Sequence, residues 1–216
     1  YIQSQSRKQS NDNHSKVWYR KNMTKSNVKP TITSSKHTIT SSVRAIIEYT
    51  HAHGDLIPAQ LSVARAQAGT RGHQAVHRSR PPAYQAEVPL KKTITSENID
   101  VIIQGRADGI FQEDDGYIID EIKTTTRELE ELSEDYQPMH WYQGQMYGYI
   151  FAEQEKLESI TIQLTYYQLS HEETKEYRKT FSFKELESFF QETVTPFISW
   201  QENILHWEQE RDKSIE

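Results

Sequence analysis

Two short segments with alternating apolar and polar side chains lie on either side of an acidic turn in the middle of the chain. They cover residues 106–112 and 117–124, and the run from Glu113 to Gly116 separates them. Alternation with period two predicts β-strands, and Asp-Gly at the end of the run is typical of a hairpin turn. The chain is therefore expected to contain an antiparallel hairpin, which needs further strands and helices to cover its apolar side chains.

The rest of the chain supplies such elements. Ser41 and Ser42 are candidate N-caps of a first helix that ends near residues 53–55. Helical periodicity predicts further helices over residues 58–80 and 138–155 and from residue 184 onward, the last kinked at Pro196. Further strands are expected at residues 84–90, 99–104, 159–169 and 175–182. The predicted fold class is α/β, with a central mixed β-sheet flanked by helices.

The composition excludes several kinds of site. The 216 residues include no cysteine, which removes disulfides, thiolate zinc sites and iron–sulfur clusters together. No apolar run approaches the roughly 20 residues of a membrane-spanning helix, and the first residues do not resemble a signal peptide. A cytoplasmic protein without membrane contact is therefore expected, large enough for one domain with a real core.

The net charge of -6 hides an uneven distribution along the chain. Residues 1–96 carry 15 Lys and Arg against 4 Asp and Glu, and residues 97–216 carry 10 against 27. Residues 1–38 are rich in Ser, Asn, Lys and Thr, which predicts a disordered or extraneous segment ahead of a domain over residues 39–216. The positive excess fits either this tail or a partner-binding half of the chain.

The hairpin brings three charged side chains to one face of the sheet. Facing residues in an antiparallel pair have position numbers with a constant sum. A loop over residues 113–116 gives the sum 229 and sets Asp108 opposite Glu121. A loop at residues 115–116 gives 231 and sets Asp108 opposite Lys123. Either register puts all three on one face, because side chains alternate along a strand.

Two carboxylates this close favour a cation between them. Directly opposed Cβ atoms lie about 5 Å apart, where Asp108 and Glu121 would repel each other without a cation. Hard oxygen ligands suit magnesium or manganese, and the carbonyl of Ile122 is a candidate further ligand. Lys123 is placed to position a water or hydroxide and to stabilise charge on a phosphate. For the hairpin alone, an ordinary surface salt bridge explains the same residues.

Four short motifs extend the hairpin pattern into the neighbouring helices. They are Gly69-Thr70-Arg71-Gly72-His73, Gly105-Arg106-Ala107-Asp108, Glu121-Ile122-Lys123 and Gln143-Gly144-Gln145-Met146-Tyr147. In order and element type they resemble the RecB-like branch of the PD-(D/E)XK nuclease superfamily. That branch shows Gly-x-x-x-His, Gly-x-x-Asp, (Asp/Glu)-x-Lys and Gln-x-x-x-Tyr. The resemblance spans residues 43–200 and implies a restriction-endonuclease-like core.

The resemblance implies a magnesium- or manganese-dependent deoxyribonuclease without an iron–sulfur cluster. The carboxylates of Asp108 and Glu121 would bind the metal, and His73 would complete the metal shell. In the family, the glutamine and tyrosine of the last motif help to position the lysine and the DNA. The implied catalytic residues are Asp108, Glu121, Lys123, Gln143 and Tyr147.

A narrower resemblance concerns the segments 119–125 and 140–143. They look like the nuclease domain that precedes a DinG- or Rad3-like helicase in some bacterial proteins. This implies action on DNA, single-stranded or with ends, in repair or processing, with a helicase domain or subunit as partner. The chain contains no Walker-type loop, so a helicase domain would lie beyond Glu216.

Some neighbouring residues allow a second interpretation. Asp120 precedes Glu121, but only Glu121 has a lysine two residues later on the same face, so Asp120 is expected to support the ligands from outside. Glu87, on the preceding strand, is expected to contact a metal or its water in the same indirect way. His73 and His77 have the spacing of a zinc-protease helix, which needs Glu where this chain has Gln74.

Basic residues near these motifs could contact phosphates or form a solvated surface. They are Arg65, Arg71, Arg78, Arg80, Lys91 and Lys92. Two other functions fit the same motifs: a non-catalytic DNA-binding or assembly module of this fold, and a hydrolase of small phosphoesters. The first would bind DNA without cleaving it, and the second would be indifferent to polymer length. Exonuclease or endonuclease action, strand polarity and oligomeric state stay open.

Overall fold

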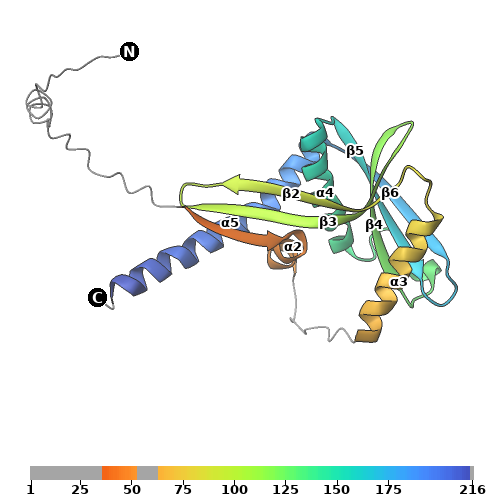
Figure 1. The fold of residues 1–216 in the computed structure, drawn as a ribbon, viewed down its shortest axis with the longest axis horizontal. Coiled ribbons are helices and arrows are strands. Elements are labelled where there is room, and N and C mark those ends of the chain that lie inside the picture. The colour runs from red at the N-terminus through yellow and green to blue at the C-terminus, as the bar shows by residue number, and fades with distance from the viewer. Residues whose placement is uncertain (1–35, 53–62, 215–216) are drawn as a thin grey trace, which may run out of the picture. The chain divides into compact units, whose positions relative to one another are not determined.

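The computed structural model describes residues 36–52 and 63–214. In these residues a mixed six-stranded sheet is flanked by four α-helices (Figure 1), which confirms the predicted fold class. Of the segment expected to be a tail, residues 1–35 lie outside the described residues. The sheet begins at His37, within that expected segment.

The six strands belong to a single sheet. They are β1 (His37–Ser42), β2 (Gln85–Thr95), β3 (Ile99–Glu113), β4 (Gly116–Thr125), β5 (Ser159–Gln168) and β6 (Thr174–Ser182). The strand order is β1-β3-β4-β5-β6, and β2 also pairs with β3. The pairs β1–β3 and β4–β5 are parallel, whereas β2–β3, β3–β4 and β5–β6 are antiparallel.

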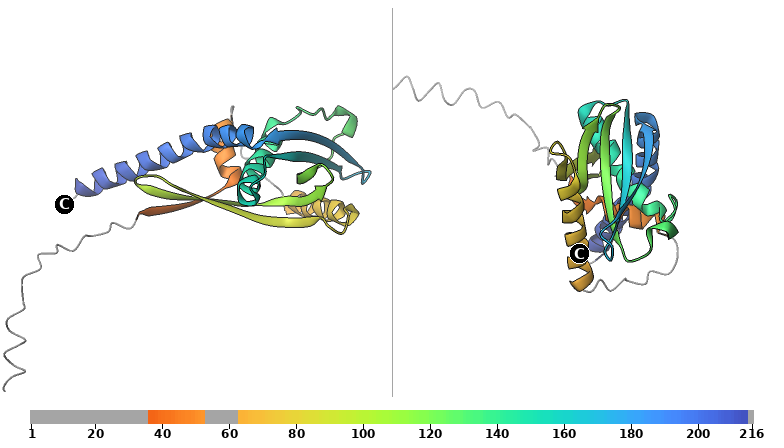
Figure 2. Two further views of the ribbon diagram at one scale, coloured as in Figure 1. Left: turned by 90° about the horizontal axis from the view of Figure 1, so that it is seen from above. Right: turned by 90° about the vertical axis from the view of Figure 1, so that its right-hand side faces the viewer.

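The helices lie on both faces of the sheet (Figure 2). They are α2 (Val43–His51), α3 (Val63–Ser79), α4 (Pro138–Glu155) and α5 (Phe183–Lys213), with a short 3-10 helix η1 (Leu129–Glu131). Helix α3 covers β4 and β5 on one face, while α2, α4 and α5 pack together on the other. Because α4 lies between the sheet and α5, its side chains are buried on more than one side.

Most of the expected elements are confirmed, but the expected break between two strands at Gly105 is wrong. Ser42 caps α2 by accepting the Ala45 N–H at 3.1 Å, and α4 has the expected bounds. The two strands expected on either side of Gly105 are one continuous strand, β3. The start expected for α3 at residue 58 lies outside the described residues, and α5 runs without interruption through Pro196.

The hairpin has the register with the sum 229, and the alternative register is wrong. Glu113 pairs with Gly116 and Gly109 pairs with Asp120. The loop therefore consists of Asp114 and Asp115, which is shorter than the loop expected for this register. Gly116 has φ +121°, a backbone conformation that a residue with a side chain rarely adopts.

The strands β3 and β4 separate where the motif residues lie. Along one edge of β3, residues 99–104 pair with β1 and residues 109–113 pair with β4, which leaves residues 105–108 without a strand partner on that edge among the described residues. Beyond Asp120, β4 continues alongside β5 alone. We call this opening between β3 and β4, at residues 105–108 and 121–123, the fork.

Candidate active site

Asp108 ties three elements together at the fork. Its Oδ2 accepts the backbone N–H of Ile122 in β4 at 2.7 Å. Its Oδ1 lies 3.3 Å from Nδ1 of His73 in α3. The Asp108 carboxylate thus accepts a backbone hydrogen bond from β4 where β3 has no strand partner on that edge among the described residues. It also lies beside His73, so the first and second motifs meet at the fork.

Glu121 and Lys123 lie next to Asp108 in the register, on β4. The Glu121 side chain is buried, with 1% of the residue exposed, and its Oε1 accepts a hydrogen bond from the Lys123 ammonium. The same ammonium donates to Oε1 of Gln143 in α4 at 3.1 Å. The other oxygen of Glu121, Oε2, is buried and has no hydrogen-bond partner among the described residues. A buried polar atom without a partner costs free energy, and such atoms are uncommon.

Burial sets the protonation of this cluster. It raises the pKa of Glu121 to about 7, with the charge of Asp108 raising it further and the charge of Lys123 opposing the shift. Burial alone would lower the pKa of His73, but the hydrogen bond and the charge of Asp108 raise it above its ordinary value. Both shifts favour the protonated forms in the metal-free site, and protons there compete with a cation for the same atoms.

Glu87 approaches Asp108 from the other edge of β3. The pairs Ala86–Gly109 and Val88–Ala107 place Glu87 opposite Asp108 in the register. Glu87 has φ +56°, in the left-handed region that a glutamate rarely adopts. Ligand atoms of His73, Glu87 and Asp108 lie within 4.8 Å of one another. Strained backbone is often found at functional sites, and here it accompanies a group of candidate metal ligands.

The glutamine and tyrosine of the fourth motif both face the fork from α4. Gln143 contacts Lys123, as described above, and Tyr147 lies over Gly105 of β3. A Cβ atom at Gly105 would lie 2.6 Å from the Tyr147 hydroxyl oxygen. Burial raises the pKa of Tyr147, and the charges of Glu121 and Asp108 add to the shift. Gly105 therefore allows β3 to continue under the tyrosine, where the sequence had suggested a break.

In the first motif, the glycine that packs closely against the sheet is Gly72 and not Gly69, the glycine with which the motif begins. A Cβ at Gly72 would lie 2.3 Å from Cγ2 of Thr124 and 3.0 Å from Cδ1 of Tyr167, whereas one at Gly69 would lie 3.7 Å from Oγ1 of Thr124. Of these distances, only the 2.3 Å from Gly72 to Thr124 is so short that a Cβ atom would force its neighbour to move. The close contact between α3 and the sheet thus rests on Gly72, and it brings His73 to the fork.

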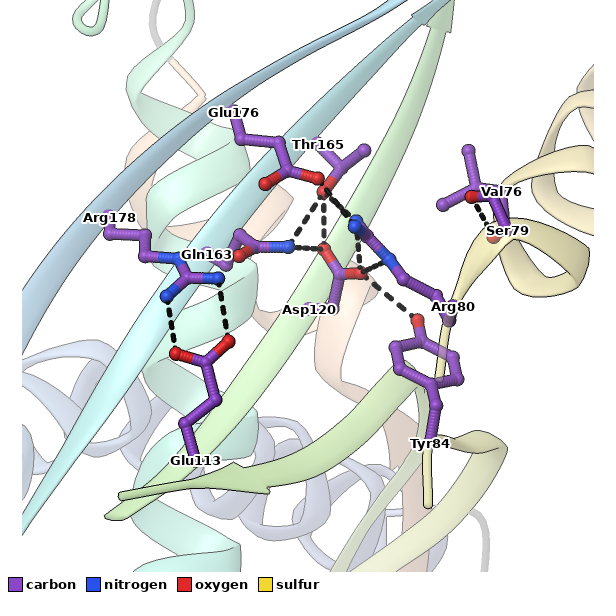
Figure 3. A network of polar contacts seen from close by, with 10 residues as sticks. All are labelled: Val76, Ser79, Arg80, Tyr84, Glu113, Asp120, Gln163, Thr165, Glu176 and Arg178. Atoms are coloured by element: carbon purple, nitrogen blue, oxygen red, sulfur yellow. Dashed lines mark hydrogen bonds and ion pairs between the residues drawn. The ribbon is translucent and has the colours of Figure 1, made fainter. Parts of the chain in front are cut away.

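Asp120 points to the opposite face of β4 from Glu121, because side chains alternate along a strand. Figure 3 shows the polar network around Asp120. Asp120 is 0% exposed. Its carboxylate accepts two hydrogen bonds from Arg80, at 3.1 and 2.8 Å, and one from Tyr84 at 3.1 Å. Gln163 and Thr165 of β5 donate two more, at 3.1 and 2.5 Å. Both oxygens of Asp120 thus have hydrogen-bond donors. Oε2 of Glu121 has none among the described residues.

The side chain and the backbone of Ile122 face different surroundings. Its side chain is buried against Val76 of α3 and Tyr167 of β5, as expected. Its N–H points into the fork, where it binds Asp108. In an extended strand the N–H and C=O of one residue point to the same edge, so the carbonyl of Ile122 is directed to the fork as well.

Two of the basic residues considered for phosphate binding have other partners. Arg80 is bound by Asp120 and, through Nη1, by Glu176 at 2.5 Å. The Lys92 ammonium lies 2.5 Å from Glu153 and over the ring of Tyr149. Tertiary contacts that the sequence does not reveal thus pair the charges of these two residues within the protein.

Two adjoining pockets open beside Lys123. Their volumes are about 570 and 300 Å³, and both are lined by Lys123, Gln137 and His140. Arg65 and Arg127 line the larger one. No sequence pattern pointed to Gln137 or Arg127, because they lie between β4 and α4 in an irregular segment whose side-chain directions periodicity cannot predict.

The chain belongs to the PD-(D/E)XK nuclease superfamily, since the family model of that superfamily matches residues 5–211. Among solved structures, a protein described as SSO0001 is similar over 76% of this chain and 79% of its own, with 20% sequence identity and a TM-score of 0.47. The search of curated proteins finds no match. Among the described residues, no helix has the length and apolar character to cross a membrane.

The fork fits a divalent cation. The grouped ligand atoms are carboxylate oxygens of Asp108 and Glu87 and an imidazole nitrogen of His73, a donor set that suits magnesium or manganese. Glu121 is not in this group, but its carboxylate lies beside Asp108 in the register. Oε2 of Glu121 tests the fit, because it is buried without a donor among the described residues and a cation would supply the partner that it lacks there. Members of this superfamily are typically nuclease hydrolases that use divalent metals.

Proposed function

We propose that this chain is a magnesium- or manganese-dependent nuclease that hydrolyses phosphodiester bonds of DNA, with its active centre in the fork. The observation that carries the proposal is Oε2 of Glu121, which is buried beside Asp108 and Lys123 and has no hydrogen-bond partner in the part of the chain that the structure describes. Membership of the superfamily supports the reaction type. We assign Asp108, Glu121 and Lys123 to the reaction itself, and Gln143 and Tyr147 to the positioning of these groups.

The metal would be held by Asp108 and Glu121, with His73 and the Ile122 carbonyl as further ligands. Glu87 joins this set because its carboxylate lies near His73 and Asp108. Bound there, the metal would lower the pKa of a water and neutralise charge on the phosphate. Asp120 supports the site from the opposite face by holding β4 to α3 through Arg80.

The chain's own cation at the fork is Lys123. Glu121 and Gln143 both accept hydrogen bonds from its ammonium, which fixes its position on the side of the fork where the two pockets open. An ammonium held there stabilises the negative charge that develops on a phosphate during hydrolysis. Gln143 is a positioning residue, since it acts through Lys123. Tyr147 contacts Gln143 and the backbone at Arg106, which holds α4 against the fork.

The same motifs support a finer assignment to the RecB-like branch. Gln143 and Tyr147 both face the fork, as the Gln-x-x-x-Tyr motif of that branch would require. The chain has no cysteine for an iron–sulfur cluster. We extend the proposal to a cytoplasmic nuclease domain over residues 39–216 that acts in DNA repair or processing alongside a helicase.

The proposal is tested by cleavage of end-labelled single- and double-stranded DNA in magnesium or manganese. Lys123→Ala is compared with wild type and with Lys184→Ala, an exposed lysine outside the fork. We expect cleavage by wild type and by Lys184→Ala, and its loss in Lys123→Ala. Binding of fluorescent single-stranded DNA without cleavage in either metal would instead show a non-catalytic module of this fold.

A further inference from the structure

The larger pocket beside Lys123 has the size and the lining of a nucleotide site. Its volume of about 570 Å³ lies in the range of sites that enclose small ligands. Residues from three segments line it: Arg65 of α3, Arg127 and Tyr136 of the segment after β4, and His140 of α4. It adjoins the fork at Lys123, so a ligand bound there would be continuous with a phosphate in the fork.

An exposed aromatic ring forms one wall of this pocket. Tyr136 is 42% exposed. The guanidinium carbon of Arg127 lies 5.6 Å from the centre of its ring. Tyr166, which is buried, supports the Tyr136 ring edge to face with centroids 6.4 Å apart, and its hydroxyl lies 3.0 Å from Nδ1 of His140. In proteins that bind single strands, unstacked bases stack on aromatic rings of this kind, which their neighbours hold in place and which lie beside a cation.

The charge that faces the pocket is positive although the segment itself is acidic. Residues 128–135 contain five Asp and Glu. Glu134 and Asp135 lie 2.9 and 3.3 Å from the Lys179 ammonium on β6, and Glu128 accepts from Gln168 at 3.0 Å. Burial, helped by the charge of Lys123, lowers the pKa of His140 to about 3, so its ring is neutral. No Asp or Glu of the described residues lines the pocket, and the cationic groups of its lining are Arg65, Arg127 and Lys123, the last paired with Glu121.

We propose that this pocket binds one unpaired nucleotide of the DNA strand next to the scissile phosphate, with its base stacked on Tyr136 and its phosphate contacted by Arg65 and Arg127. This rests on the proposed nuclease function and adds a substrate class to it. A base in the interior of a duplex has both faces covered by neighbouring pairs, so a base next to a bond cleaved inside the strand must leave the duplex before it can stack on a protein ring. The strand that is cleaved is therefore single-stranded at this nucleotide.

An abasic-site scan of a single-stranded oligonucleotide tests this with the full chain. One base at a time is removed at successive positions around the cleaved bond, and KM and kcat are measured for wild type, Tyr136→Leu and Tyr136→Phe. Leucine keeps an apolar side chain but lacks the flat ring, whereas phenylalanine keeps the ring. Trp207→Leu is the matched control, because Trp207 is an aromatic residue exposed by 76% in α5.

We expect one position near the cleaved bond where loss of the base raises KM about tenfold for wild type, the size of a stacking interaction. Tyr136→Leu should raise KM by a similar factor with the intact oligonucleotide and show no further effect of the missing base at that position. Tyr136→Phe and Trp207→Leu should resemble wild type. Equal KM values for Tyr136→Leu and wild type on every oligonucleotide would overturn the proposal, as would cleavage of an intact duplex as efficient as that of the single strand.

Failure of the nuclease function is distinguished by fluorescence anisotropy in calcium with the same oligonucleotides. If wild type cleaves no DNA but binds single strands about tenfold more tightly than Tyr136→Leu does, the pocket is supported and the nuclease proposal is wrong. If wild type cleaves DNA and Tyr136→Leu binds and cleaves like wild type, the nuclease proposal stands and the pocket proposal is wrong.

Discussion

Two adjacent carboxylates of β4 have opposite surroundings. Asp120 and Glu121 are 0% and 1% exposed. Asp120 lies on the face covered by α3 and accepts five hydrogen bonds. Glu121 lies at the fork, where one oxygen has only Lys123 as a donor and the other has no partner among the described residues. Equal burial thus accompanies opposite hydrogen-bond environments in these two neighbouring acids.

The difference lies in what compensates the buried charge. The Asp120 network includes Arg80, which also binds Glu176, so its charges are paired within the protein (Figure 3). Glu121 has a pKa raised to about 7, mainly by burial, because the single ammonium of Lys123 does not offset its desolvation. A strongly shifted acid beside candidate ligands is typical of a functional site. Helix α3 joins the two regions, with Arg80 following its end and His73 within it.

The largest expected effect concerns catalysis at the fork. Glu121→Gln should reduce metal-dependent DNA cleavage at least about a thousandfold, because it removes a metal-binding charge and the partner of Lys123. Initial rates on labelled DNA in manganese, with circular dichroism to check the fold, measure this. Asp120→Asn should retain clear activity by the same assay. If the two variants lost activity equally, the contrast between the neighbours would not hold.

The reverse pattern is expected for stability. Asp120→Ala should lower the free energy of unfolding by about 3 kcal/mol, since it leaves a buried arginine without its main partner. Denaturant unfolding followed by fluorescence measures the change. Asp212→Ala, which removes an exposed aspartate near the end of α5, should change it by less than about 0.5 kcal/mol. Wild-type stability in Asp120→Ala would show that the network contributes nothing to the fold.

The pH dependence of stability should reveal the uncompensated charge. A folded-state pKa of about 7, above the ordinary value of 4.5, means that folding favours protonated Glu121. This contribution is fully present below pH 4.5 and is lost as the pH rises through 7. In metal-free buffer, Glu121→Gln should therefore gain about 3 kcal/mol relative to wild type between pH 4.5 and pH 8. Parallel stability curves for the two proteins over that range would contradict the pKa shift.

The smallest expected effect tests the helix that joins the two regions. Gly72→Ala should destabilise the chain by about 1 to 3 kcal/mol, because its Cβ would overlap Thr124. Gly69→Ala should be neutral or stabilising by up to about 1 kcal/mol, because its Cβ has room and alanine favours helix. Thermal unfolding of both variants gives the comparison. Equal destabilisation would mean that α3 lies differently against β4.

The sequence predicted local structure well because local rules decide it. The Ser42 cap, the bounds of α4 and the hairpin all follow from residues close together in the chain. The four motifs also identified residues that the structure brings together at the fork, since Asp108, Glu121, Lys123 and His73 depend on strand alternation and helix spacing.

What the sequence could not predict depends on distant contacts. Ile39 is the one apolar residue of strand β1, and the pairing of β1 with β3 spans about sixty positions, so the local pattern marks this strand weakly. The left-handed backbone of Glu87 is held by its neighbours rather than by any preference of glutamate. The donors to Asp120 come from beyond α3 and from β5, and Tyr136 lies in an irregular segment.

The central claim is that the partnerless oxygen of Glu121 is a metal ligand. Isothermal titration calorimetry of manganese into the wild type, Glu121→Gln and Asp120→Asn tests it most directly. We predict that the wild type and Asp120→Asn bind manganese with similar affinity and that Glu121→Gln binds at least about tenfold more weakly. Equal manganese affinity in Glu121→Gln and the wild type would contradict the claim.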